Sequence, residues 1–141
     1  MRRLTLSTTR REDLVDITAE VARAVSDAGL AEGAALVYSP HTTAGITINE
    51  GADPDVRRDI LAHLAQLVPN RADFRHAEGN SDAHIKTSLM GPSQLVPVTG
   101  GRLQLGTWQK IYFCEFDGPR KRTVLVQCLA APSSSGAGEG A

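Results

Sequence analysis

The sequence has few aromatic residues and no excess of either charge. Phe, Trp and Tyr make up 4% of the 141 residues, and 15 Lys and Arg stand against 16 Asp and Glu, for a formal net charge of −1. A nearly balanced charge produces no long-range field that attracts a polyanion or an anionic bilayer. We therefore expect neither a nucleic acid nor a membrane as the partner.

Long apolar runs are also missing. No stretch approaches the roughly 20 apolar residues of a membrane-spanning helix, and the first thirteen residues, MRRLTLSTTRRED, lack the apolar core of a signal peptide. These absences predict a cytoplasmic protein.

Cysteine is scarce as well, since the chain has only Cys114 and Cys128. If the strands paired antiparallel about a turn at Gly118 and Pro119, the two cysteines would not lie opposite each other, so we expect no disulfide. Both side chains are expected to be buried apolar filler.

The apolar content is enough for one core, because 41% of the residues are hydrophobic. We expect a single domain over residues 1–130. The last residues, 131–141, carry few side chains that can pack, which predicts a disordered tail.

Strand and helix patterns occur in blocks. Alternating or continuous apolar residues predict strands over 2–9, 34–38, 46–49 and, as antiparallel sheet, within 94–129. Helical spacing predicts helices over 16–28 and 54–68, the latter capped by Asp53, and a short helix over 82–90. Strands at both ends with two to three packed helices between them favour the α+β class.

Histidines suggest a metal site. His41 follows Pro40 at the end of an apolar strand, and polar residues alternate around Gly79, namely His76, Glu78, Asn80, Asp82 and His84. Three neutral imidazoles, His41, His76 and His84, match the three protein ligands and one open position of catalytic zinc. The alternative is that His76 and His84 only form hydrogen bonds within a polar loop, because their spacing is not a tight metal signature.

Further candidates lie near the predicted turn. Glu115 and Asp117 share one strand face and can hold a metal or act as a base. Arg120, together with Lys121 and Arg122, can bind phosphate through paired hydrogen bonds, or the three residues form a charged hairpin tip that protects an edge strand.

Other polar positions support structural roles equally well. Asn49 and Glu50 lie at a strand-to-helix junction, where free amides can bind an anion. Trp108 can stack on a heterocycle or pack on a sheet. His63 lies on the apolar side of the second helix and is expected to be a packed structural residue.

Four blocks together resemble the YjbQ family. They are HTTAGITINE at 41–50, HAEGNSDAH at 76–84, LGTWQ at 105–109 and DGPR at 117–120. The resemblance, which covers residues 2–129, implies a β-sandwich-like mixed or antiparallel core, a homotrimer, and a metal site near subunit boundaries. It also implies a weak secondary thiamine-phosphate synthase activity, which joins hydroxymethylpyrimidine diphosphate to a thiazole phosphate and releases pyrophosphate.

Matched motif positions supply the expected site. The metal ligands are His41, His76 and His84; the catalytic residues are Glu50, Glu115 and Arg120; the residues that bind the small phosphorylated substrate are Asn49, Asn80, Trp108, Asp117 and Arg120. The expected cofactor is a divalent ion, either zinc or a similar metal, or magnesium with a diphosphate. The alternatives are a metal-dependent hydrolase of a phosphate ester and a non-enzymatic metal-binding oligomeric module.

Overall fold

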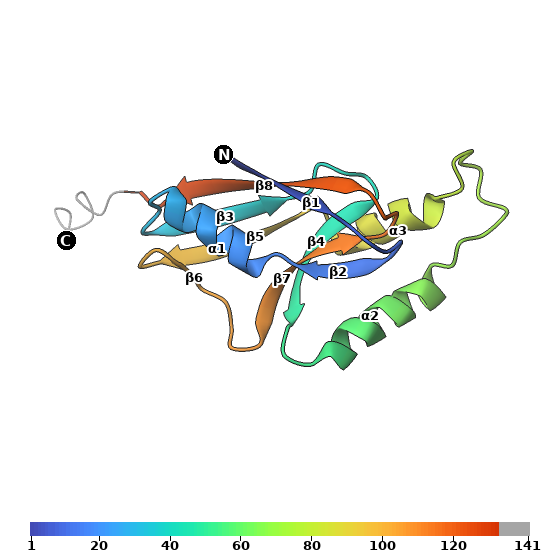
Figure 1. The fold of residues 1–141 in the computed structure, drawn as a ribbon, viewed down its shortest axis with the longest axis horizontal. Coiled ribbons are helices and arrows are strands. Elements are labelled where there is room, and N and C mark those ends of the chain that lie inside the picture. Colours follow the sequence, from blue (N-terminus) through green and yellow to red (C-terminus); the bar gives the residue numbers. More distant parts are fainter. Residues whose placement is uncertain (133–141) are drawn as a thin grey trace, which may run out of the picture.

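Two antiparallel sheets and three helices make up the described part of the chain, residues 1–132 of a computed structural model (Figure 1). The larger sheet has the strand order β1-β8-β3-β5-β6 and the smaller one β2-β7-β4. In chain order the elements are β1 (Arg2–Ser7), β2 (Asp13–Asp16), α1 (Thr18–Asp27), β3 (Gly33–Tyr38), β4 (Ala44–Glu50), α2 (Pro54–Leu67), α3 (Ser81–Met90), β5 (Ser93–Thr99), β6 (Arg102–Leu103), β7 (Gln109–Glu115) and β8 (Lys121–Ala130).

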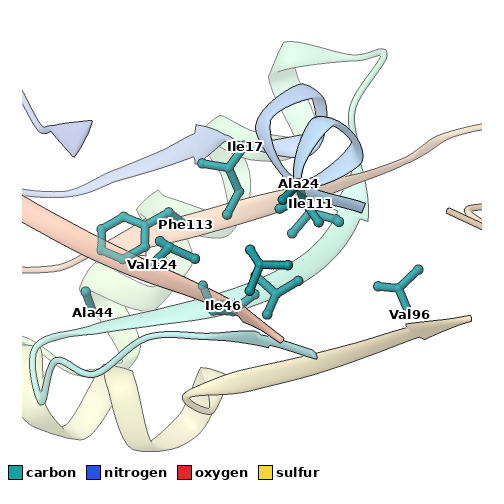
Figure 2. Packing of buried hydrophobic residues seen from close by; sticks show 11 residues of the cluster. Ile17, Ala24, Ala44, Ile46, Val96, Ile111, Phe113 and Val124 are labelled. Atoms are coloured by element: carbon teal, nitrogen blue, oxygen red, sulfur yellow. The ribbon is translucent and has the colours of Figure 1, made fainter. Parts of the chain in front are cut away.

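The main core lies between the inner faces of the two sheets. Figure 2 shows side chains of β4 and β7 and side chains of β5 and β8 in the space between the sheets, with residues of α1 beside them. This cluster contains Ile17, Val21, Ala24, Val37, Ala44, Ile46, Val96, Ile111, Phe113, Val124 and Val126. The predicted α+β class with a β-sandwich-like core is confirmed.

A second core lies on the other face of the small sheet. Because side chains alternate along a strand, β7 sends Ile111 and Phe113 into the main core and Tyr112 and Cys114 to the opposite side. There they meet α2 and α3, which form a third layer. Burial raises the pKa of the Cys114 thiol, so this cysteine is an apolar filler, as expected. Cys128 is only half-buried, and both cysteines are free.

The helices begin and end close to where the sequence predicts. Asp53 caps α2 by accepting a hydrogen bond from the amide of Asp55 at 2.9 Å, and Gly29 follows α1 with a φ of 68°. The prediction for His63 is wrong, because this residue is exposed. The apolar side chains of α2 that pack on the second core are Ile60, Leu61 and Leu64, a stripe too narrow to include position 63.

The predicted hairpin between β7 and β8 is wrong. β7 pairs with β2 and β4, whereas β8 pairs with β1 and β3. The segment from Asp117 to Arg120 therefore crosses from one sheet to the other and is not a hairpin tip. The sequence patterns also missed β2, whose four residues are too few for a visible alternation.

No helix within residues 1–132 combines the length and the apolar character needed to cross a membrane. The predicted tail, 131–141, lies outside the described residues from position 133 onward.

Candidate functional site

A polar pocket of about 290 Å³ lies where β7 leads to β8, next to the start of α3. Figure 1 shows these elements at one end of the sheets. It is lined by Pro40, His41, Thr42, Thr43, Glu78, Asn80, His84, Asp117, Arg120 and Arg122. These residues come from three parts of the chain that are distant in sequence: the β3–β4 connection, the entry and first turn of α3, and the β7–β8 crossover with the start of β8. Five residues predicted for the site thus meet here, namely His41, Asn80, His84, Asp117 and Arg120.

A larger cavity, of about 410 Å³, opens between α1 and β8. Its charged lining residues, Arg2 and Asp27, form an exposed ion pair at 2.6 Å, so their charges largely cancel. The polar pocket is the better candidate, because several titratable groups with different neighbours converge there.

His41 is held in place by the end of the sheet. Its Nε2 atom accepts a hydrogen bond from the backbone amide of Thr123 at 2.9 Å, and its own amide donates to Ser39 Oγ at 3.3 Å. Burial, together with the positive charge of Arg122, lowers the pKa of His41 below its ordinary value. The imidazole is therefore neutral at neutral pH.

Glu115 and Arg122 form a buried ion pair beside the pocket, with side chains 0% and 3% exposed. The Glu115 carboxylate accepts hydrogen bonds from Arg122, from Thr8 Oγ1 at 2.9 Å and from the Asp117 amide at 2.9 Å. With both oxygens used, Glu115 does not fit the predicted role of a catalytic base. The Arg122 Nη2 atom also donates to Thr43 Oγ1 at 2.9 Å, so the pair joins two of the pocket segments.

Asp117 connects the remaining polar residues. It accepts hydrogen bonds through Oδ2 from Asn80 Nδ2 at 2.7 Å and from Arg120 Nη2 at 3.1 Å. Asn80 Oδ1 is buried and has no hydrogen-bond partner among the described residues. A buried acceptor without a donor costs about 1–3 kcal/mol, which makes this atom the least satisfied polar group of the site.

His76 and His84 lie together at the entry to α3. Their ring centroids are 5.2 Å apart with nearly perpendicular planes, and His76 Nε2 is 3.7 Å from the Glu78 carboxylate. Two imidazoles at this separation can share an ion.

The predicted site of three histidines is not assembled, however. Within residues 1–132 no three His, Cys, Asp or Glu side chains gather closely enough to hold a metal. His41 is the member that does not fit, because its Nε2 lone pair already accepts the Thr123 bond.

An ion network that sequence reasoning missed fixes α3 beside the pocket. Lys86 donates to Asp82 at 3.2 Å and to Glu12 at 2.8 Å, and Arg11 donates to Asp82 through two nitrogens. Both Asp82 and Lys86 are 1% exposed. Their spacing of four residues places them on one helix face, but the same spacing is common on solvated faces, so the sequence carried no signal of burial.

The remaining predicted residues lie elsewhere. His41 precedes β4 and Glu50 ends it, and a strand of this length spans about 20 Å. Glu50 lies opposite Gln109, and Trp108 is beside it with 64% of its surface exposed. Hence Asn49, Glu50 and Trp108 do not join the pocket within one chain. Of the two alternatives for Trp108, packing on a sheet does not occur in the isolated chain.

Known proteins resemble this chain along nearly its whole length. The family described as UPF0047 protein YjbQ-like matches residues 2–131. The UPF0047 protein YugU of Bacillus subtilis is 52% identical over 130 residues, which cover 92% of this chain and 98% of YugU. The UPF0047 protein MJ1081 of Methanocaldococcus jannaschii is 52% identical over 124 residues, 88% of this chain and 90% of its own.

Solved structures give the same result. The crystal structure of an uncharacterized YjbQ/UPF0047 family protein from Clostridium acetobutylicum superposes with a TM-score of 0.90 at 53% identity, and the match covers 92% of this chain and 100% of that one. Motifs, fold and identity agree over the described domain, and the chain belongs to the UPF0047 (YjbQ-like) family.

Proposed function

We propose that this chain is a cytoplasmic enzyme that acts on a small phosphorylated substrate in the polar pocket. The observation that carries the proposal is Arg122, which is almost fully buried yet lines the pocket. Its Nη1 atom makes no hydrogen bond to the described residues and keeps some contact with solvent, on a residue that lines the pocket. The free N–H of a guanidinium nitrogen in this position can donate a hydrogen bond to an anion.

The rest of the pocket suits a ligand that has an anionic group at one end and hydrogen-bond donors at the other. Arg120 adds a second guanidinium close enough to His41 to act on its charge, whereas Asn80, Asp117 and Glu78 offer acceptors. A phosphorylated heterocycle that carries N–H groups would satisfy both sets. The reaction we propose is the one that the family resemblance implies, formation of thiamine phosphate with release of pyrophosphate. Arg120 and Arg122 would stabilise the negative charge that grows on the departing pyrophosphate.

A divalent ion remains part of the proposal at the pair formed by His76 and His84. Zinc or a similar metal suits imidazole ligands, and magnesium would come with a diphosphate. The roles of the two arginines do not depend on that ion.

The reaction can be tested directly. We expect the purified chain to release pyrophosphate from hydroxymethylpyrimidine diphosphate and thiazole phosphate, and Arg120→Ala to lower kcat/KM by about tenfold to a hundredfold, the effect of one charge-assisted hydrogen bond. Arg58→Ala is the matched control, because Arg58 is an exposed arginine of α2 outside the pocket.

Other results of these assays would favour a different function. Turnover of simple phosphate esters alone would favour a phosphate-ester hydrolase. Absence of both turnover and pyrophosphate binding would refute a phosphorylated substrate.

Self-association is the second part of the proposal. The outer face of the five-stranded sheet has no covering element in residues 1–132, and apolar side chains stand next to one another across its strands. Leu36 pairs with Leu95, Tyr38 with Leu125, and Leu129 with Ala34. Large apolar surfaces of this kind mark interfaces, and we propose that the face is buried between copies of this chain in a homotrimer.

A further inference from the structure

The backbone amide of Thr123 determines how His41 presents its two ring nitrogens. The β3–β8 ladder ends at the pair Tyr38 and Leu125, because Pro40 turns the chain away from the sheet. Two residues before Leu125, the Thr123 amide donates to His41 Nε2 at 2.9 Å. The imidazole thus supplies the acceptor that a further residue of β3 would have offered if the ladder continued.

This bond settles which nitrogen carries the proton. A neutral imidazole has one donor and one acceptor nitrogen, and Nε2 is the acceptor here. The ring is kept neutral by its burial and by the nearby Arg122. The proton of His41 therefore lies on Nδ1.

The Nδ1–H group is available to a ligand. It makes no hydrogen bond to the described residues, and it is not among the buried unpartnered atoms, so it reaches solvent from a residue that lines the pocket. Arg122 Nη1 is available in the same pocket, and Arg122 is the neighbour of Thr123 in the chain. The two donors thus belong to residues that line the same pocket.

We propose that His41 is a fixed Nδ1–H donor to an oxyanion of the ligand, acting beside Arg122, and is not a metal ligand. The proposal rests on the phosphorylated substrate proposed above. A histidine that binds a metal gives its lone pair to the ion and donates its other N–H to an acceptor. His41 instead meets a donor at Nε2. A metal at Nε2 would displace the Thr123 amide. A metal at Nδ1 would require the Nδ1 proton to move to Nε2, which would also break the Thr123 bond, or to leave the ring.

Nuclear magnetic resonance tests the tautomer without any substrate. In protein labelled with ¹⁵N-histidine, long-range ¹⁵N–¹H spectra at neutral pH should show the His41 proton on Nδ1, with the signals assigned by their loss in His41→Gln. Addition of zinc should leave both His41 nitrogens unchanged. A proton on Nε2, or a zinc-induced shift at His41, would overturn the proposal even if substrate binds.

A matched pair of variants tests the donor role, with pyrophosphate as the calorimetric probe. His41→Gln can place an acceptor near Nε2 but has no group at Nδ1, so we expect an unchanged Tm and about tenfold to hundredfold weaker binding. His41→Asn can place a donor near Nδ1 but leaves the Thr123 amide unpaired, so we expect a lower Tm and better retained binding.

Two results would count against the donor role. Equal pyrophosphate affinity in wild type and His41→Gln would overturn it while leaving the phosphorylated substrate in place. A wild-type protein that binds no pyrophosphate would instead refute the proposed function, and with it the donor role, whatever the tautomer.

Discussion

Residue by residue, the chemistry of the pocket depends on which charges are already neutralised. Glu115 is fully used by Arg122, Thr8 and the Asp117 amide, so its role is to hold Arg122. One nitrogen of the Arg122 guanidinium makes no hydrogen bond to residues 1–132. In the function proposed above, this buried ion pair holds Arg122 in position to bind the anion.

Removing the acidic partner should be costly. We expect Glu115→Gln to destabilise the protein by about 3–5 kcal/mol, because a buried guanidinium would be left without its counter-charge. Urea unfolding followed by circular dichroism measures this change. The exposed pair of Arg58 and Asp55 provides the control, and Arg58→Gln should leave the unfolding midpoint in place. A small effect of Glu115→Gln would mean that water or another group reaches Arg122.

Individual site residues were predictable where a motif marked them. His41, Asn80, His84, Asp117 and Arg120 line one pocket, as their shared motif positions suggest. Arg122 was predicted only as one of three consecutive basic residues that could bind phosphate or form a charged hairpin tip, and its burial was not predicted. Its burial follows from pairing across the sheets, which no local pattern records.

Among the elements, α3 is unusual because its buried face is largely polar. The buried residues of this helix are Asp82, Ala83, Lys86 and Thr87, so ion pairs contribute much of its attachment to the β1–β2 segment. The same helix begins just after Asn80 and carries His84. The geometry of the pocket therefore depends on an electrostatic contact that pH can disturb.

Acid should weaken this attachment. Burial alone would raise the pKa of Asp82, but hydrogen bonds from Arg11 and Lys86 outweigh burial and hold the pKa below its ordinary value. A lowered folded-state pKa adds stability above the unfolded value of about 3.9, and this stability is lost as pH falls through the folded-state pKa.

The test compares unfolding free energies of wild type and Asp82→Asn across that pH range. We expect the variant to be less stable at neutral pH, with the difference shrinking in acid. A difference that does not change with pH would show that the ion pairs of Asp82 do not stabilise α3.

Most helices and strands could be predicted from the sequence pattern. Helical periods and a side-chain cap marked α1 and α2, because these signals act within a few residues. The hairpin between β7 and β8 was predicted wrongly, since strands close in sequence usually pair, yet here each strand belongs to a different layer.

At the scale of the whole molecule, the outer face of the five-stranded sheet is not covered by any element of residues 1–132, and this raises the question of assembly. Leu95 on this face is 59% exposed in the isolated chain. We expect Leu95→Glu to convert a trimer to monomers in sedimentation equilibrium, because a charge would be buried at the interface. Leu67→Glu is the matched control, since Leu67 is similarly exposed but lies on α2. Dissociation by both variants, or by neither, would contradict this choice of surface.

The sequence by itself determined the class of fold, the positions of the helices and most strands, and the motif residues that mark the family, because periodicity, capping and motif identity are local properties. Only the tertiary structure decided which strands share a sheet, that Glu115 is consumed in a buried ion pair, and that His41 lies about a strand's length from Glu50 and Trp108. Those outcomes depend on contacts between residues far apart in the chain, whose burial and hydrogen-bond partners exist only once both sheets have come together.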